Sequence, residues 1–400
     1  MLKKIVSIII IIPVIWNMQI KCFCDDNVED ELNCPVFLKQ SASIPNVEAQ
    51  SAIVIDRETG RVLYEKDAYK KRPMASTTKI MTAIVALERG DMKDVVKISK
   101  KAASIGGSII KLKEGESYRL EELMYGLLMK SGNDAAIAIA EHIGGDVNSF
   151  VNMMNAKAVS INALDTNFVN PHGLDRDNHY TTAYDLANIA RYAMKDPRFA
   201  KIVATKSKSI SLGKSFNNTN EMLFLYHGCN GVKTGFTGKA GRCLVTSVKR
   251  GTEEYISVVL GCETKNKRAQ SSKEILDYAY QNYKRYELIN KEYAYTTVKV
   301  IKGKEKYVKV YSRDTIKLPL NEYERLGICT NEYIQNNLMA PVHDDQNIGY
   351  IEFKVDDKII AKTDILAKEG VLRKEFVDYI KDFLDLLIKS VNNHTVGKKL

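Results

Sequence analysis

The sequence contains no internal repeat and no low-complexity tract, and beyond its first 24 residues it has no closely spaced cysteine pair. None of the later cysteines has the spacing of metal ligands, so we expect buried or free thiols. The six histidines form no zinc pattern, and we expect His172 and His179 to hold loop structure rather than a metal. The sequence therefore predicts neither a metal nor a cofactor. Its seven cysteines are Cys22, Cys24, Cys34, Cys229, Cys243, Cys262 and Cys329.

A long hydrophobic run is also lacking, because the apolar stretch from Ile5 to Trp16 is too short to span a bilayer comfortably. Lys3 and Lys4 precede this stretch, and Asp25 follows it closely. This order is typical of a secretory signal in residues 1–24, with cleavage near Cys24. The pattern predicts an exported protein, with an uncleaved membrane anchor as the alternative.

No predicted helix carries an unbroken basic stripe, although 59 basic and 49 acidic residues leave a net charge of +10. The basic residues are spread along the chain. This distribution favours an anionic surface or polymer as partner, and we expect no binding to nucleic acid.

What the sequence does contain is enough apolar material for a large core, with 45% hydrophobic residues in a chain of 400. Residues 51–66 read as a hairpin, and residues 231–262 as three successive strands. From about residue 290 the chain is strand-like with lysine-rich turns, which predicts a second, smaller, mostly β domain. The predicted helices cover residues 73–91, 118–130, 134–145, 181–194 and 271–288.

The helix predicted at 73–91 is apolar on nearly every face, which indicates burial. Lys79 is costly in such a helix unless it has a partner, and Ser76 lies three positions earlier on the same face. Burial lowers the pKa of a lysine, and a neutral amine beside a serine hydroxyl can activate it as a nucleophile. The alternative is a helix cap at Ser76 with a Lys79 side chain that reaches towards solvent.

Ser-x-x-Lys also occurs at Ser108 and Ser211, but in segments that look like loops or a strand. Two further motifs favour the Ser76 pair. Ser131-Gly-Asn133 separates two predicted helices, and Lys233-Thr-Gly235 sits in a short strand. Each motif is common alone, but this order at these structural positions is specific.

The chain resembles the low-molecular-mass penicillin-binding proteins, the serine D-alanyl-D-alanine carboxypeptidases. Beyond the three motifs, the resemblance rests on "SGNDAAIAIAEHIGG", "NPHGLD", "HYTTAYDLANIAR", "GVKTGFTGKAGRCLV" and "NNLMAPVHDDQNIGYIEF". It implies an α/β (α+β) fold of the penicillin-binding and β-lactamase type, with an antiparallel sheet flanked by helices. A small C-terminal all-β domain and a terminal amphipathic helix follow. The implied divisions are signal 1–24, linker 25–46, catalytic domain 47–288, β domain 289–368 and helix with tail 369–400.

The resemblance also implies roles for individual residues. Ser76 attacks the terminal D-Ala-D-Ala peptide, Lys79 takes its proton, and Ser131 relays a proton to the leaving D-alanine. Asn133 holds Lys79 and the substrate amide. Lys233 positions Ser131 and supplies positive charge near the substrate carboxylate.

The remaining implied roles concern binding of the substrate. Thr234 and Arg268 bind the terminal carboxylate, Gly235 lets the substrate backbone approach, and the backbone N–H groups of Ser76 and Phe236 form the oxyanion hole. An ordinary surface arginine is the alternative for Arg268. The implied partners are the peptidoglycan pentapeptide stem and β-lactam inhibitors, outside the cytoplasmic membrane or in the cell wall.

Two other functions fit the same motifs. A serine β-lactamase needs an extra general base, such as a glutamate between the second and third motifs, and no Glu-x-x-Leu-Asn pattern occurs there. A non-catalytic wall-binding scaffold should have lost a catalytic residue, and none is missing.

Residues 371–391 predict an amphipathic helix that is too charged to span a bilayer. Its apolar face could pack on the β domain or lie on a membrane, and the resemblance favours peripheral membrane contact. Its polar face mixes signs of charge, so anionic lipid should add little.

Overall fold

The structure is a computed structural model that describes residues 44–396, with side chains as far as Lys389. The predicted signal and nearly all of the predicted linker lie outside the described residues, as do Cys22, Cys24 and Cys34. Within the described part, no helix is both long enough and apolar enough to cross a bilayer.

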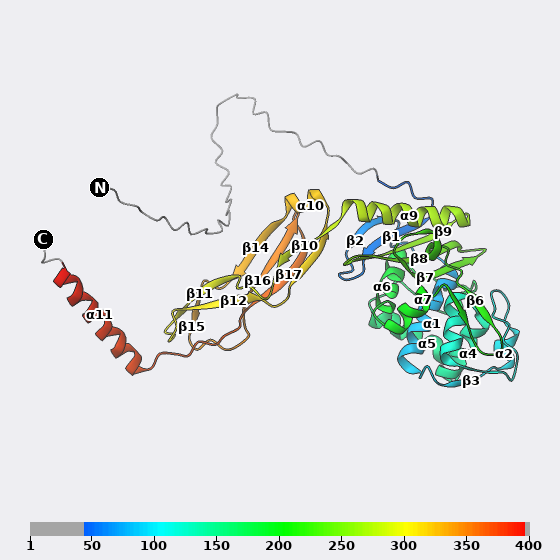
Figure 1. Cartoon of the computed structure of the whole chain (residues 1–400), viewed down its shortest axis with the longest axis horizontal. Coiled ribbons are helices and arrows are strands. Elements are labelled where there is room, and N and C mark those ends of the chain that lie inside the picture. The colour runs from blue at the N-terminus through cyan, green and yellow to red at the C-terminus, as the bar shows by residue number, and fades with distance from the viewer. Residues whose placement is uncertain (1–43, 397–400) are drawn as a thin grey trace, which may run out of the picture. The chain divides into compact units, whose positions relative to one another are not determined.

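The first half of the chain is organised around a five-stranded antiparallel sheet with the order β2-β1-β9-β8-β7. The hairpin joins the later strands directly, since Ile53 lies opposite Val258. Both faces of the sheet are covered, by α9 on one side and by helices such as α6 on the other (Figure 1), so the middle of β8 and of β9 is buried. The strands are β1 (Ser51–Asp56), β2 (Val62–Lys66), β7 (Cys229–Thr237), β8 (Gly241–Arg250) and β9 (Glu253–Cys262).

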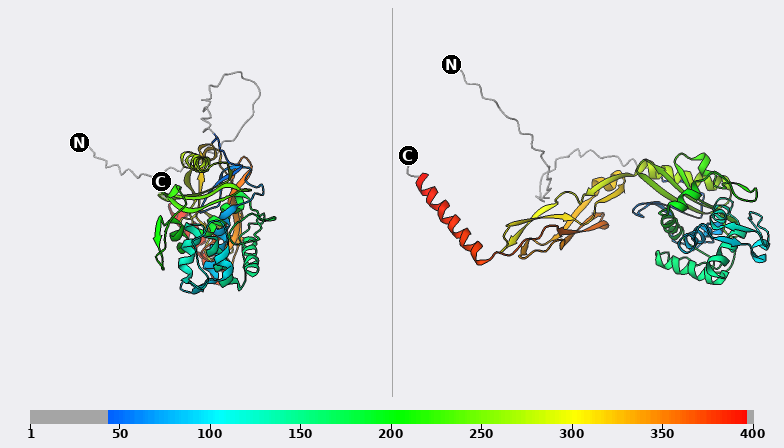
Figure 2. Two further views of the ribbon diagram at one scale, coloured as in Figure 1. Left: turned by 90° about the vertical axis from the view of Figure 1, so that its right-hand side faces the viewer. Right: turned by 60° about the horizontal axis from the view of Figure 1, so that its bottom comes forward.

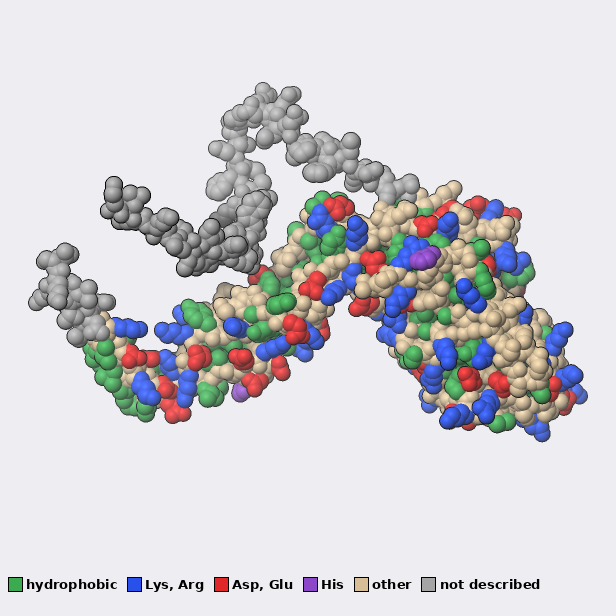
Figure 3. All heavy atoms as spheres, viewed as in Figure 1, with side chains coloured by type: hydrophobic (Ala, Val, Ile, Leu, Met, Phe, Trp, Pro, Cys, Tyr) green, Lys and Arg blue, Asp and Glu red, His purple; other side chains and the backbone are tan. Residues whose placement is uncertain are grey.

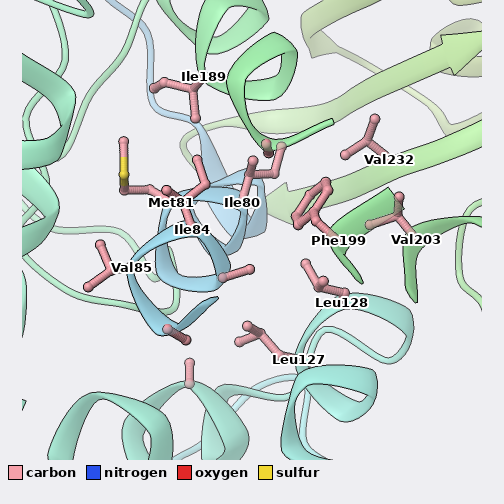
Figure 4. Close-up of a cluster of buried hydrophobic side chains, with 14 of the residues drawn as sticks. Ile80, Met81, Ile84, Val85, Leu127, Leu128, Ile189, Phe199, Val203 and Val232 are labelled. Carbon is pink, nitrogen blue, oxygen red and sulfur yellow. The ribbon is translucent and has the colours of Figure 1, made fainter. Parts of the chain in front are cut away.

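The helices of this region pack around α1, which contacts helices on several sides. Figure 4 shows Ile80, Met81, Ile84 and Val85 of α1 among apolar side chains of α3, α6, α7 and β7. The elements are η1 (Ala75–Thr78), α1 (Lys79–Arg89), β3 (Val95–Lys97), α2 (Lys100–Ser104), β4 (Ser117–Arg119), α3 (Leu120–Met129), α4 (Asn133–Gly144), α5 (Val147–Ser160), α6 (Ala183–Ala193), α7 (Pro197–Ala204), β5 (Ser207–Ser209), β6 (Ser215–Asn217), α8 (Met222–Leu225) and α9 (Lys265–Asn282).

Three predicted helices of this region contain a segment that is not α-helical in the structure. The helix predicted from residue 73 begins as a 3₁₀ turn at Ala75, so Pro73 precedes it. The one predicted from residue 118 begins at Leu120, because the preceding residues pair with β3. The helix predicted at 271–288 spans Lys265–Asn282, and residues 284–289 form a strand instead.

The second region is mostly β, as the sequence predicts. Its main sheet has the order β14-β16-β17-β12-β11-β15, and β10 pairs with β13 in a separate ladder. The elements are β10 (Lys284–Ile289), β11 (Thr296–Ile301), β12 (Tyr307–Ser312), β13 (Ile316–Leu320), α10 (Glu322–Gly327), β14 (Cys329–Ile334), β15 (Asn337–Met339), β16 (Gln346–Val355) and β17 (Lys358–Ala367).

The last helix, α11, spans Phe376–Val396 and so begins later than the sequence predicts. The residues before it belong to the β region, because Val371 pairs with Val342 and Lys374 N–H donates to the carbonyl of Lys302. In Figure 2, α11 is one continuous helix. Apolar side chains run along it and are exposed to solvent (Figure 3), among them Phe376, Ile380, Phe383 and Leu387.

Candidate active site

The turn η1 presents Ser76 immediately before the buried helix α1. Residues three apart nearly eclipse each other in a 3₁₀ turn, so Ser76 and Lys79 share one side. Ala75, just before the serine, has φ of 49°. A non-glycine residue in this left-handed region is strained, and such strain is frequent at functional sites.

Lys79 is fully buried and forms a network of three hydrogen bonds. Its Nζ donates to Ser76 Oγ at 2.9 Å, Asn133 Oδ1 at 2.8 Å and the His172 carbonyl at 2.5 Å. Burial, reinforced by the charge of Lys233, holds the pKa of Lys79 well below its ordinary value. An amine with a lowered pKa, 2.9 Å from a hydroxyl, has both the protonation state and the reach of a general base.

The connection between α3 and α4 brings Ser131 and Asn133 to the same place. Ser131 is buried and adopts φ of 64°, another left-handed conformation. Asn133 opens α4, accepts from Lys79 and donates through Nδ2 to the Gly106 carbonyl at 2.7 Å. The carboxylate of the next residue, Asp134, accepts from the backbone N–H groups of Ile110 and Leu112. These contacts fix the loop of residues 105–112 beside the second motif.

Strand β7 carries the third motif. Lys233 is buried, its Nζ donates to the Thr234 carbonyl at 2.8 Å, and burial lowers its pKa to about 7. Among the described residues, no hydrogen bond joins Lys233 to Ser131, and the role of Lys233 in positioning Ser131 stays a prediction. The Thr234 hydroxyl lies 3.1 Å from that of Thr219.

The space beside Gly235 is occupied by the turn that carries the serine. A Cβ at this position would lie 3.1 Å from Ala75 Cβ and 3.2 Å from Ser76 N. The structure thus shows a second reason for a glycine at position 235, besides the predicted approach of the substrate backbone. Strand β7 passes so close to η1 that a side chain here would crowd the turn. Phe236 is 52% exposed, and the Arg242 guanidinium lies over its ring at 3.8 Å.

Arg268 is buried in α9 and is therefore not an ordinary surface arginine. Its guanidinium pairs with Glu221 at 2.5 Å. The pair orients the arginine towards the cavity that also contains Ser76.

The predicted residues converge on a cavity of about 300 Å³. Ser76, Ser131, Thr234, Gly235, Phe236 and Arg268 line it, whereas Lys79, Asn133 and Lys233 lie behind this lining. Ser108 of the second Ser-x-x-Lys sequence lines it too, but Ser211 does not. The sequence analysis did not single out four of the lining residues, which are Lys130, Thr219, Arg242 and Lys265.

The loop of residues 170–179 contributes in ways that sequence reasoning missed. The His172 carbonyl accepts from Lys79, and the Pro171 carbonyl accepts from Thr82 Oγ1 at 2.6 Å. The sequence did point to this loop, because it includes the segment "NPHGLD" on which the family resemblance partly rests. It could not show that backbone carbonyls of the loop accept hydrogen bonds, because side-chain types do not reveal backbone acceptors. His179 bonds Thr78 at 2.8 Å, and burial lowers its pKa to about 4, so it is a neutral structural residue at pH 7.

A serine at the start of a helix, a buried lysine on its hydroxyl and a second serine in the same cavity define a serine acyl-transfer site. The comparisons with known proteins agree with this class. A family model described as D-alanyl-D-alanine carboxypeptidase matches residues 38–264. A second model, described as penicillin-binding protein 5, C-terminal domain, matches residues 283–373. The chain belongs to the D-alanyl-D-alanine carboxypeptidase family, peptidase family S11, whose members are serine hydrolases.

Relatives and solved structures cover both regions. The D-alanyl-D-alanine carboxypeptidase DacF of Bacillus subtilis is 36% identical over 344 residues, 84% of this chain and 88% of the relative. DacC of Escherichia coli is 30% identical over 361 residues, 86% and 90% of the two chains. Penicillin binding protein 5 from Haemophilus influenzae superposes with a TM-score of 0.73 at 28% identity, covering 82% of this chain and 99% of the other. The predicted mixed fold with a C-terminal β domain is confirmed.

Proposed function

We propose that Ser76 is the nucleophile with which this carboxypeptidase removes the terminal D-alanine from peptidoglycan stem peptides. The observation that carries the proposal is the 2.9 Å contact between the amine of Lys79 and the hydroxyl of Ser76. Lys79 takes the proton as Ser76 Oγ attacks the carbonyl of the penultimate residue. The C–N bond to the terminal D-alanine then breaks, and water hydrolyses the ester that remains on Ser76.

Two neighbours support this chemistry. Asn133 holds the Lys79 amine beside Ser76 and has its own amide fixed by Gly106, which pre-organises the pair. Ser131 lines the cavity, where its hydroxyl can pass a proton to the departing amine nitrogen. The backbone N–H groups of Ser76 and Phe236 form the oxyanion hole in this proposal, because both residues line the same cavity.

The terminal carboxylate of the substrate is bound by Thr234 and Arg268, with Lys233 adding positive charge from behind. Thr234 and Arg268 both line the cavity, and Arg268 is held in place by Glu221. Binding of the terminal carboxylate positions the scissile bond next to Ser76. In this proposal the enzyme therefore cleaves only the last peptide bond of the stem.

β-Lactams acylate the same serine and inhibit the enzyme in this proposal. The β-lactamase alternative requires a carboxylate base for rapid deacylation. Among the described residues that line the cavity there is no aspartate or glutamate. The complete set of catalytic side chains likewise argues against a non-catalytic scaffold.

The enzyme acts outside the cytoplasmic membrane, consistent with cell-wall relatives and with the signal-like residues 1–24. We assign peripheral membrane contact to α11, because its apolar side chains are exposed. A helix with one apolar face and a charged face binds in the plane of a bilayer surface.

Release of D-alanine from a synthetic stem pentapeptide tests the catalytic proposal. Ser76→Ala should lose several orders of magnitude in rate, because members of a catalytic unit act together. Ser108→Ala is the matched control, since Ser108 lines the same cavity and also precedes a lysine by three positions. Near wild-type release by Ser76→Ala would refute the assignment, especially if Ser108→Ala abolished it.

A further inference from the structure

The cavity that contains Ser76 has more positive charge than one substrate carboxylate requires. Four cationic side chains line it, namely Lys130, Arg242, Lys265 and Arg268. Only Arg268 has a carboxylate partner, Glu221. In residues 44–389, whose side chains are described, no ion pair involves Lys130, Arg242 or Lys265.

A neighbouring cation on α9 shows the contrast. Lys267 lies two residues beyond Lys265 and pairs with both Glu48 and Glu263, each at 2.7 Å. Lys267 is thus neutralised by carboxylates, whereas the three cations that line the cavity are available for a ligand.

The three free cations come from separate elements. Lys130 follows the last residue of α3 and directly precedes Ser131, Arg242 lies near the start of β8, and Lys265 is the first residue of α9. Arg242 is also held in place, because its guanidinium lies over the ring of Phe236 at 3.8 Å. Stacking uses the face of the guanidinium and leaves its N–H edge for a carboxylate.

We propose that Lys130, Arg242 and Lys265 bind a second carboxylate of the stem peptide, on a side chain that precedes the two terminal alanines. The proposal rests on the function proposed above, in which Thr234 and Arg268 already bind the terminal carboxylate. The enzyme then prefers stem peptides with a free side-chain carboxylate to those in which it is amidated. Amidation removes the negative charge and the charge-assisted hydrogen bonds while it leaves the length of the peptide unchanged.

Two synthetic peptides test this preference. Both end in D-Ala-D-Ala and are identical except that the preceding residue carries a side-chain carboxylate in one and a carboxamide in the other. For the wild-type enzyme we expect kcat/KM to favour the carboxylate by about tenfold, the range of one charge-assisted contact. The preference should weaken as salt is added, because part of the site is open to solvent.

Substitution assigns the preference to the three cations. Lys130→Gln, Arg242→Gln and Lys265→Gln should each lower the ratio of the two kcat/KM values, and the triple variant should bring it near one. The matched control is Lys273→Gln, which removes the same charge as each single variant. Lys273 is an exposed lysine on α9 that does not line the cavity. This variant should keep the wild-type ratio, so that net charge alone cannot explain the effect.

Equal rates on the two peptides, or a ratio that survives in the triple variant, would overturn this inference. A ratio lowered equally by Lys273→Gln would also overturn it, because a general field would then suffice. Failure of the underlying function looks different, since neither peptide would release D-alanine and Ser76→Ala would change nothing. Circular dichroism and a melting curve for each variant separate a lost preference from a lost fold.

Discussion

Two buried lysines in this site differ in what surrounds each amine. Lys79 bonds a serine, an asparagine and one carbonyl, whereas Lys233 bonds a single carbonyl. Burial lowers the pKa of both lysines, and the charge of Lys233 lowers that of Lys79 as well. In the proposed mechanism Lys79 is the neutral base because its amine contacts the Ser76 hydroxyl, and Lys233 is the cation that serves the substrate carboxylate.

Lys79→Arg should lose at least about a thousandfold in D-alanine release, because a guanidinium stays protonated and cannot accept the proton of Ser76. Single-turnover acylation by a chromogenic β-lactam gives the direct measurement. A melting curve is the control for folding. Acylation at a rate close to that of the wild type would eliminate Lys79 as the base.

The pKa of about 7 for Lys233 predicts a pH dependence. Below this value the amine is charged and attracts the carboxylate, and above it the charge is lost. The kcat/KM of the wild-type enzyme should therefore fall as pH rises through about 7, since kcat/KM reports groups of the free enzyme. Lys233→Arg keeps its charge at high pH, so its profile should lack this fall even if its rate is lower. A fall at the same pH in both proteins would assign the titration to another group.

At the scale of elements, the site depends on how closely two segments approach the turn η1. Gly235 of β7 packs against it. Gly173 packs against it too, and a Cβ there would lie 2.0 Å from the Ala75 carbonyl oxygen. Gly173 belongs to the loop whose His172 carbonyl accepts from Lys79. The position of Ser76 is therefore set by backbone contacts as much as by α1.

Gly173→Ala should displace Ser76 and lower both stability and activity. Gly173 has φ of +91°, and its Cβ would also clash with backbone. Gly213→Ala is the control, since Gly213 has φ of +68° but nothing within 4 Å of a Cβ. We expect about 1 kcal/mol of strain in the control and several times that loss in Gly173→Ala, with more than tenfold lower kcat. Equal losses of melting temperature and of activity in the two variants would contradict this account.

Sequence patterns predicted the strands of the sheet well and the helix starts less well. β8 and β9 have the predicted bounds because each is an apolar run closed by polar or glycine residues. The start of α3 was predicted too early because residues 117–119 are a strand only through pairing with β3, a partner distant in sequence. The strand at 284–289 was missed for the same reason, since its partner is β13.

At the scale of the whole molecule, the three motifs predicted which segments meet at the site, and the structure brings all three together. The motifs could not predict that Arg242 and Lys265 line the cavity, because both reach it from elements that carry no motif. Nor could they predict that α11 begins at Phe376, since residues 371–374 are held by contacts with the β region.

The exposed apolar face of α11 predicts membrane association. Full-length mature protein should pellet with phosphatidylcholine liposomes, whereas protein ending at residue 375 should stay in the supernatant and retain its activity. Added anionic lipid should change binding little, because the polar face mixes charges. Phe383→Glu with Leu387→Glu should release the protein, while Lys381→Glu on the other face should not. If full-length protein also stays in the supernatant, α11 has another role.

The central claim is that Ser76, activated by Lys79, forms the acyl-enzyme. Its most direct test is mass spectrometry of the protein after brief incubation with a labelled penicillin, followed by proteolysis and mapping of the adduct. We predict one long-lived adduct on the peptide that contains Ser76, and none in Ser76→Ala. An adduct on Ser108 or Ser131 instead, or rapid release of hydrolysed penicillin without accumulation of an adduct, would contradict the account.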